Sequence, residues 1–163
     1  MHIVTNRTKT TIVNAAFLQD VKDENLRLWA IVRDLRSLRY AEHEAHEAAR
    51  QLVDLLSELR DSIALQFSLE ETYGFIECAP HSPQFGAADA ETAKAQHREL
   101  YLQLHEMVEQ AEEAQYRGTI GRDLPIFVIA FESFDASFRA HEELEQELIR
   151  CGLGISRFGS TNF

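Results

Sequence analysis

The sequence is poor in the residues that cross-link a fold or turn the chain, with two cysteines, three prolines and seven glycines in 163 residues. So few turn-forming residues leave little room for the many tight turns of an all-β protein. Two cysteines cannot make a disulfide framework, and we expect Cys78 and Cys151 to be small buried thiols.

Positive charge and long apolar runs are also scarce. There are 16 Lys and Arg residues against 27 Asp and Glu residues, which gives a net charge of −11. This balance argues against binding to nucleic-acid phosphates or to an anionic membrane surface. No apolar run reaches the roughly 18 residues of a bilayer span, and the first residues lack the pattern of a secretory signal. We therefore expect a cytoplasmic protein that binds neither nucleic acid nor membrane.

The sequence is well supplied with apolar residues at helical spacing. They recur every three or four residues in four stretches, at residues 17–38, 47–78, 89–116 and 123–152. Short connections between four such stretches predict an all-α fold, an antiparallel up-down-up-down four-helix bundle over residues 17–151. Residues 1–16 and 152–163 are polar or contain Gly and Ser, and we expect them to form terminal tails.

Polar residues interrupt these apolar stripes at positions that should face the bundle interior. Their distances from the helix ends would place them all at one end of an alternating bundle. The interrupting residues are Asn25, Gln66, Glu70, His97, Tyr101, His141 and Glu145. Burying each of them unpaired would cost about 1–3 kcal/mol, so the sequence predicts a polar layer that has partners.

Two interpretations of this layer follow from the residue types. Two imidazoles and two carboxylates that converge in an apolar interior are the ingredients of a metal site. The same groups can instead form a metal-free hydrogen-bonded network, in which protonated His pairs with Glu.

Three short motifs at these positions resemble those of the hemerythrin-like (HHE cation-binding) family, over residues 17–151. The run Gln66-Phe67-Ser68-Leu69-Glu70-Glu71 resembles the family's His-Phe-x-x-Glu-Glu at the end of its second helix. The runs from His97 to Tyr101 and from His141 to Glu145 resemble the motifs of its third and fourth helices. The resemblance implies a four-helix bundle that binds non-haem iron.

The chain departs from the family pattern at three of the ligand positions. Asn25 and Gln66 stand where the resemblance would place histidine ligands of one iron, and Tyr101 replaces a ligand of the other. What remains is a metal set with two imidazoles, a possible phenolate and two bridging carboxylates, namely Glu70, His97, Tyr101, His141 and Glu145. The resemblance therefore implies one iron ion rather than two, or a site that has lost its metal.

The function implied by the resemblance is iron or oxidant handling, or sensing of O₂ or NO. Reversible O₂ carriage by paired irons is the least favoured role, because a tyrosine ligand stabilises ferric iron. The alternative is a metal-free bundle that acts as a structural or protein-interaction module, in which the amides of Asn25 and Gln66 hydrogen-bond to Glu70 and Glu145. No motif indicates an enzymatic substrate, and a protein partner or a homo-oligomer is left open.

A different register of the first helix would change one ligand. His43 or His46, which flank the start of the second helical stretch, would then supply the missing histidine. In the register predicted above they lie at the opposite end of the bundle, in a solvated acidic first turn.

Overall fold

The computed structural model describes residues 10–38, 45–78 and 87–154 and is mostly helical. Five α-helices of the described residues lie mainly within the four stretches in which the sequence predicts helix. Their bounds are Ala15–Glu24 (α1), Leu26–Leu38 (α2), Ala45–Leu69 (α3), Ala87–Arg117 (α4) and Ile120–Gly152 (α5). A π-helical turn, η1 (Glu70–Gly74), and two strands, β1 (Thr10–Val13) and β2 (Phe75–Cys78), complete the described elements.

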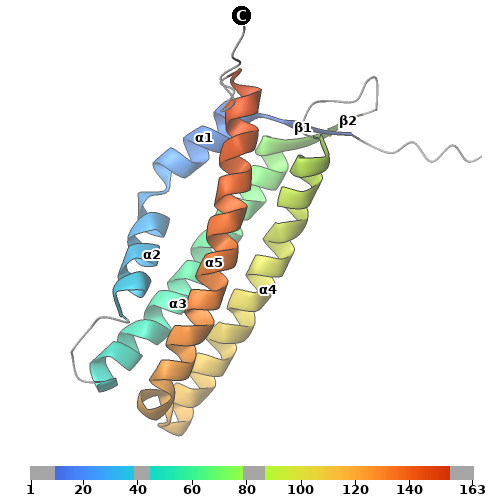
Figure 1. Ribbon diagram of the computed structural model, residues 1–163. Coiled ribbons are helices and arrows are strands. Elements are labelled where there is room, and N and C mark those ends of the chain that lie inside the picture. The colour runs from blue at the N-terminus through green and yellow to red at the C-terminus, as the bar shows by residue number, and fades with distance from the viewer. Residues whose placement is uncertain (1–9, 39–44, 79–86, 155–163) are drawn as a thin grey trace, which may run out of the picture.

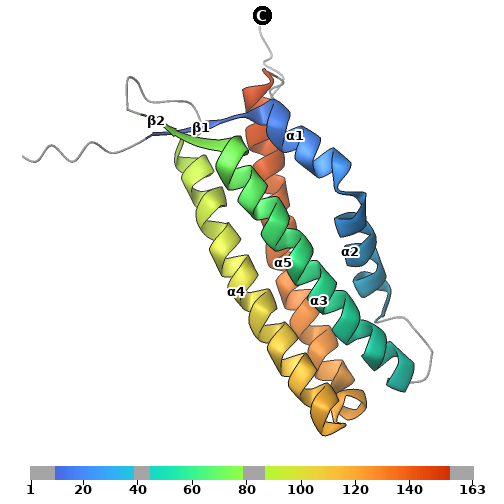
Figure 2. The same ribbon diagram turned by 180° about the vertical axis from the view of Figure 1, so that it is seen from behind.

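Three long helices lie side by side, and the two short ones form a bent rod next to them (Figures 1 and 2). α4 packs against both α3 and α5, α2 packs mainly on α3, and α1 packs on α5 and η1. The chain turns back between α4 and α5 at Gly118, whose φ of 75° lies in the left-handed region that glycine adopts without strain.

The first predicted helix is broken at Asn25. This residue ends α1 with non-helical dihedral angles, and its side-chain oxygen accepts a hydrogen bond from the Leu28 backbone N–H at 3.3 Å. Asparagine commonly caps a helix in this way, because its short side chain satisfies a free N–H of the first turn. α1 and α2 therefore have different directions, and their apolar faces do not form one continuous stripe.

The second predicted helix ends earlier than residue 78. After Leu69 the chain makes the π-helical turn η1 and then the strand β2, which pairs antiparallel with β1 in the register Val13↔Phe75. Gly74 ends the turn, and a Cβ atom there would overlap the buried Leu18 side chain of α1. Residues 10–16, which the sequence analysis placed in a tail, thus form β1 and the start of α1.

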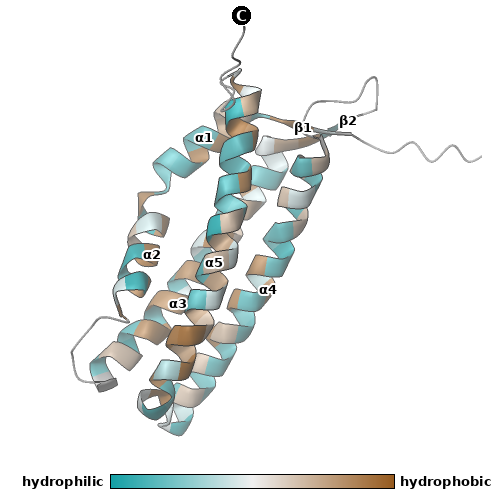
Figure 3. Cartoon of the chain, in the orientation of Figure 1, coloured by the Kyte–Doolittle hydropathy of each residue, from teal (hydrophilic) through white to brown (hydrophobic). Residues whose placement is uncertain are grey.

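The described apolar side chains form two separate clusters. The larger one fills the space between α2, α3, α4 and α5, and the smaller one joins Ala15, Leu18, Phe75, Ala90, Ala93, Leu148 and Ile149 near the small sheet. In Figure 3 the half of α5 near its C-terminal end is mostly hydrophilic, whereas the other half is more hydrophobic. No helix in the described ranges combines the length and apolar composition of a membrane span.

One of the two cysteines, Cys151, contradicts the expectation of buried thiols. Cys151 is an exposed free thiol near the end of α5. The side chain of Cys78 lies outside the described residues.

Candidate metal centre

A layer of buried polar side chains separates the two apolar clusters. On α4, His97 lies between Ala93 of the small cluster and Leu100 of the large one. On α5, His141 and Glu145 follow Phe138 of the large cluster and precede Leu148 of the small one. These three side chains and that of Glu70 are at most 3% exposed. The single polar level that the sequence predicts is thus present for these four residues.

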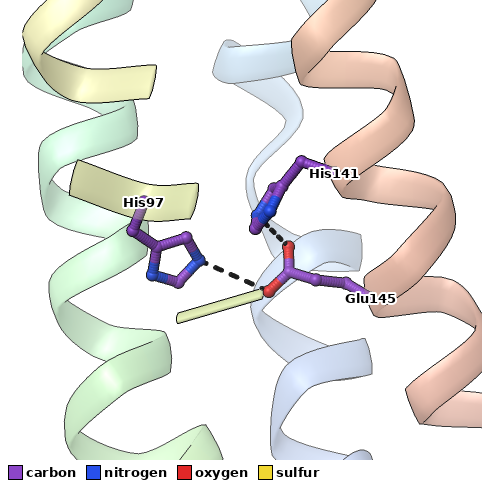
Figure 4. A group of neighbouring side chains, drawn as sticks. All are labelled: His97, His141 and Glu145. Carbon is purple, nitrogen blue, oxygen red and sulfur yellow. Dashed lines mark ion pairs between the residues drawn. The ribbon is translucent and has the colours of Figure 1, made fainter. Parts of the chain in front are cut away.

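Three of these residues converge on one another. His97 of α4 and His141 of α5 both turn toward the carboxylate of Glu145 (Figure 4). The Nε2 atom of His141 lies 2.8 Å from Glu145 Oε1, and that of His97 lies 3.5 Å from Oε2. Each residue offers one ligand atom to a group whose members all lie within 4.8 Å of one another. Among the described residues, neither Nε2 atom has a hydrogen-bond partner of acceptable geometry.

Both imidazoles present Nε2 to the centre and Nδ1 to an outer oxygen. His141 Nδ1 lies 2.9 Å from Gln96 Oε1, an acceptor that holds a proton on Nδ1. His97 Nδ1 lies 3.7 Å from Glu71 Oε1, which is beyond hydrogen-bond distance, and it has no hydrogen-bond partner among the described residues. A metal-binding histidine characteristically donates its outer N–H to a carboxylate or amide oxygen, which fixes the tautomer and leaves the inner nitrogen free to bind.

Burial keeps the His97 imidazole neutral. Loss of hydration lowers the pKa of His97, although the carboxylate of Glu145 opposes the shift. Phe67 stacks on this ring with centroids 4.0 Å apart, and Phe75 meets it edge-on at 6.0 Å. Neutral imidazole is the form that binds metal ions, so the surroundings of His97 favour its ligand form.

The two central carboxylates have opposite tendencies. Burial opposes ionisation of Glu145, but its contacts with His141, His97 and Lys22 hold its pKa well below the usual range. Burial and the nearby Glu145 charge raise the pKa of Glu70 well above the usual range. Neither oxygen of Glu70 has a hydrogen-bond partner among the described residues. The cluster therefore contains an ionised carboxylate beside one that favours its proton.

Lys22 is the cation of this layer, and it was not among the residues predicted from the sequence. Its side chain is 3% exposed, and its Nζ lies 2.7 Å from Glu142 Oε2 and 2.9 Å from Glu145 Oε1. Burial lowers the pKa of Lys22, but the three surrounding carboxylates outweigh this effect and raise it. Its position four residues after Leu18 was the available signal, since residues four apart share a helix face.

Asn25 and Gln66 are bonded to each other. Asn25 Nδ2 donates to Gln66 Oε1 at 2.8 Å, and Gln66 Nε2 is buried without a partner among the described residues. Asn25 is only half-buried, because it lies at the junction of α1 and α2. The metal-free interpretation expects these amides to bond to Glu70 and Glu145. The structure instead bonds Asn25 to Gln66.

Tyr101 lies one helical turn beyond His97 and is half-buried. Its ring stacks on His105 with centroids 5.8 Å apart. It lines a surface pocket of about 270 Å³ together with His97, Phe67 and Glu71. Tyr101 as a ligand stays a prediction. His43 and the side chain of His46, the alternative histidine ligands, lie outside the described residues.

The polar layer is thus assembled by segments far apart in the chain, and each is held by local structure. The π-helical turn begins at Glu70, and such turns often occur at functional sites. The Trp29 indole N–H donates to the Lys22 carbonyl oxygen at 2.9 Å and fixes the α1–α2 junction.

Comparison of the chain with protein-family models, with curated proteins and with solved structures finds no match.

Proposed function

We propose that this chain is a hemerythrin-like protein that binds one non-haem iron ion through His97, His141 and Glu145. Its α1–α2 rod, α3, α4 and α5 would form the antiparallel up-down-up-down four-helix bundle of that family. The observation that carries the proposal is the convergence of the Nε2 atoms of His97 and His141 on one carboxylate in a buried layer. Glu70, whose oxygens have no hydrogen-bond partner among the described residues, is a further oxygen ligand.

The ligand set suits iron. Two histidines and one carboxylate with open positions are the ligands typical of non-haem ferrous sites. A bound iron ion would supply a one-electron redox couple and an open coordination position. The chain supplies two imidazoles, of which burial keeps that of His97 neutral, an ionised carboxylate and the aromatic rings beside His97. The pocket that His97 shares with Tyr101 lies beside this centre. These properties suit iron or oxidant handling, or sensing of O₂ or NO.

A metal-free structural or interaction module is the second candidate. The ion pairs of Lys22 with Glu142 and Glu145 favour it, because they already compensate part of the buried negative charge. It accounts less well for His97, because burial lowers the pKa of this imidazole and so disfavours the protonated form that would pair with Glu145.

Metal loading distinguishes the two candidates. Metal-free protein incubated with Fe(II) under anaerobic conditions and then desalted should retain one iron ion per chain. Its melting temperature should rise, because a ligand that binds only the folded state stabilises it, by about 2.7 kcal/mol at a hundred times Kd. A chelator should reverse the shift. Iron content near zero with an unchanged melting temperature would favour the metal-free module.

The predicted role of Tyr101 has its own test. A phenolate bound to ferric iron gives a visible charge-transfer band, so the oxidised iron-loaded protein should be coloured. Tyr101→Phe should remove this band and leave the iron content unchanged, because His97, His141 and Glu145 remain. The ring already lies in the same pocket as His97. An identical spectrum in the variant would show that Tyr101 is not a ligand.

A further inference from the structure

We propose that Lys22 is a built-in cation that takes the place of a second metal ion, so that the centre holds one ion only. This inference rests on the proposed function, and it concerns the number of ions rather than whether one binds.

Three carboxylates surround the Lys22 ammonium. Its Nζ lies 2.7 Å from Glu142 Oε2, 2.9 Å from Glu145 Oε1 and 3.9 Å from Glu70 Oε2. The side chains of Glu70 and Glu145 are fully buried, and that of Glu142 is 16% exposed. A buried cation requires negatively charged oxygen atoms around it, and these carboxylates provide them. Here the cation is a side chain of the protein.

The central carboxylates face a cation position on each side. Glu145 directs Oε1 to Lys22 and His141, and Oε2 to His97. Glu70 Oε2 lies 3.9 Å from Lys22 Nζ and 3.9 Å from His97 Nε2. Two carboxylates therefore lie between the imidazoles and the ammonium. A bridging pair between two metal ions would have the same arrangement, with Lys22 in the position of one ion.

Charge balance agrees with this reading. One divalent ion and the Lys22 ammonium carry three positive charges, which match the three carboxylates around Nζ when Glu70 gives up its proton to become a ligand of the ion. A second divalent ion beside the ammonium would leave excess positive charge in a layer bounded by two apolar clusters. Like charges at such short range repel strongly where water is excluded.

Local structure holds the ammonium in place. The Trp29 indole bonds to the Lys22 carbonyl oxygen, and Leu18, one turn earlier on α1, packs against Gly74. The helix break at Asn25 follows directly. The backbone of Lys22 is thus held in place, and its side chain points to the carboxylates. It does not extend to solvent as most lysine side chains do.

Metal stoichiometry tests the proposal. Wild-type protein, Lys22→His, Lys22→Ala and Lys22→Arg are loaded with excess Fe(II) under anaerobic conditions, and iron per chain is measured after desalting. We expect one ion in the wild type and in Lys22→Arg, which keeps the charge. We expect two in Lys22→His, where imidazole joins the three carboxylates, and between one and two in Lys22→Ala. Lys94→His, at a half-exposed lysine paired with Glu77, should leave the count at one.

The outcomes separate this inference from the proposed function. Iron content near zero in the wild type overturns the proposed function. Two ions in the wild type, or one ion in Lys22→His and Lys22→Ala, overturn the role of Lys22 alone.

A measurement without variants covers the case in which they do not fold. In wild-type protein loaded with Zn(II) as a diamagnetic probe, the Lys22 Nζ protons should give a slowly exchanging NMR signal that is unchanged by a second equivalent. Loss of the signal on the second equivalent would contradict the proposal.

Discussion

Replacing Glu145 by Gln should abolish iron retention and weaken the affinity for Fe(II) by more than about a hundredfold. Glu145 is the only residue that approaches both His97 and His141 in the converging group of described residues. An amide cannot supply the negative charge that a divalent ion requires there. Even changes outside the ligand shell cost about 10–100-fold in metal affinity. Iron per chain and the titration midpoint for Fe(II) are the measurements.

The same substitution should destabilise the metal-free protein. Removing one partner of a buried ion pair costs about 3–5 kcal/mol. We expect the lower end, because Glu142 still pairs with Lys22. Glu143→Gln, at an exposed position two residues away on α5, is the matched control and should change neither quantity. Full iron retention in Glu145→Gln would remove this residue from the ligand set.

Glu70→Gln should behave differently from Glu145→Gln in the metal-free state. Burial already raises the pKa of Glu70, so the neutral amide resembles its protonated form. Iron retention should still fall, because the amide cannot become an ionised ligand.

Phe67→Ala should lower the free energy of unfolding by about 3–5 kcal/mol, the usual cost of truncating a buried phenylalanine. It should also weaken Fe(II) binding by about tenfold, as changes around the ligand shell do. The Phe67 ring is 4% exposed, stacks on His97 and meets His141 edge-on at 5.5 Å. Its loss would free the His97 ring and admit water from the neighbouring pocket. Chemical denaturation and Fe(II) titration are the measurements.

Phe127→Ala separates the two effects. Phe127 is a buried residue of the large apolar cluster on α5, about four helical turns before His141 of the polar layer. It should cost a similar amount of stability without changing the affinity for Fe(II). Equal loss of affinity in both variants would mean that Phe67 acts only through global stability.

Helix positions and the level of the polar layer were predictable from the sequence. Apolar periodicity is a strong signal in long helices, and interruptions at Glu70, His97, His141 and Glu145 can be placed by counting residues from the helix ends. The structure buries these four side chains between two apolar clusters. What their convergence binds is still a prediction.

The shape of the α1–α2 rod was harder to predict from the sequence. The series through Val21 and Asn25 assumes a straight helix, but Asn25 ends α1 and caps α2. Within α1 the buried face runs from Leu18 to Lys22, and the series through Val21 and Asn25 does not pass through Lys22. A capping asparagine and a polar residue in an apolar stripe look alike in sequence, so only the tertiary contacts distinguish them.

The end of α3 at Leu69 could not be predicted from the sequence either. Residues 70–78 have apolar members at helical spacing, yet they form a π-helical turn and a strand. Pairing with β1, far away in sequence, decides the outcome, and local periodicity carries no information about that partner.

Anomalous diffraction from crystals of the protein loaded with Fe(II) tests the centre most directly. We predict one strong peak at the iron edge per chain, within about 2.0–2.2 Å of the Nε2 atoms of His97 and His141 and of a Glu145 oxygen. Lys22 should remain beside Glu142. A peak bound only at the surface, or none at all, would contradict a metal site in the buried layer.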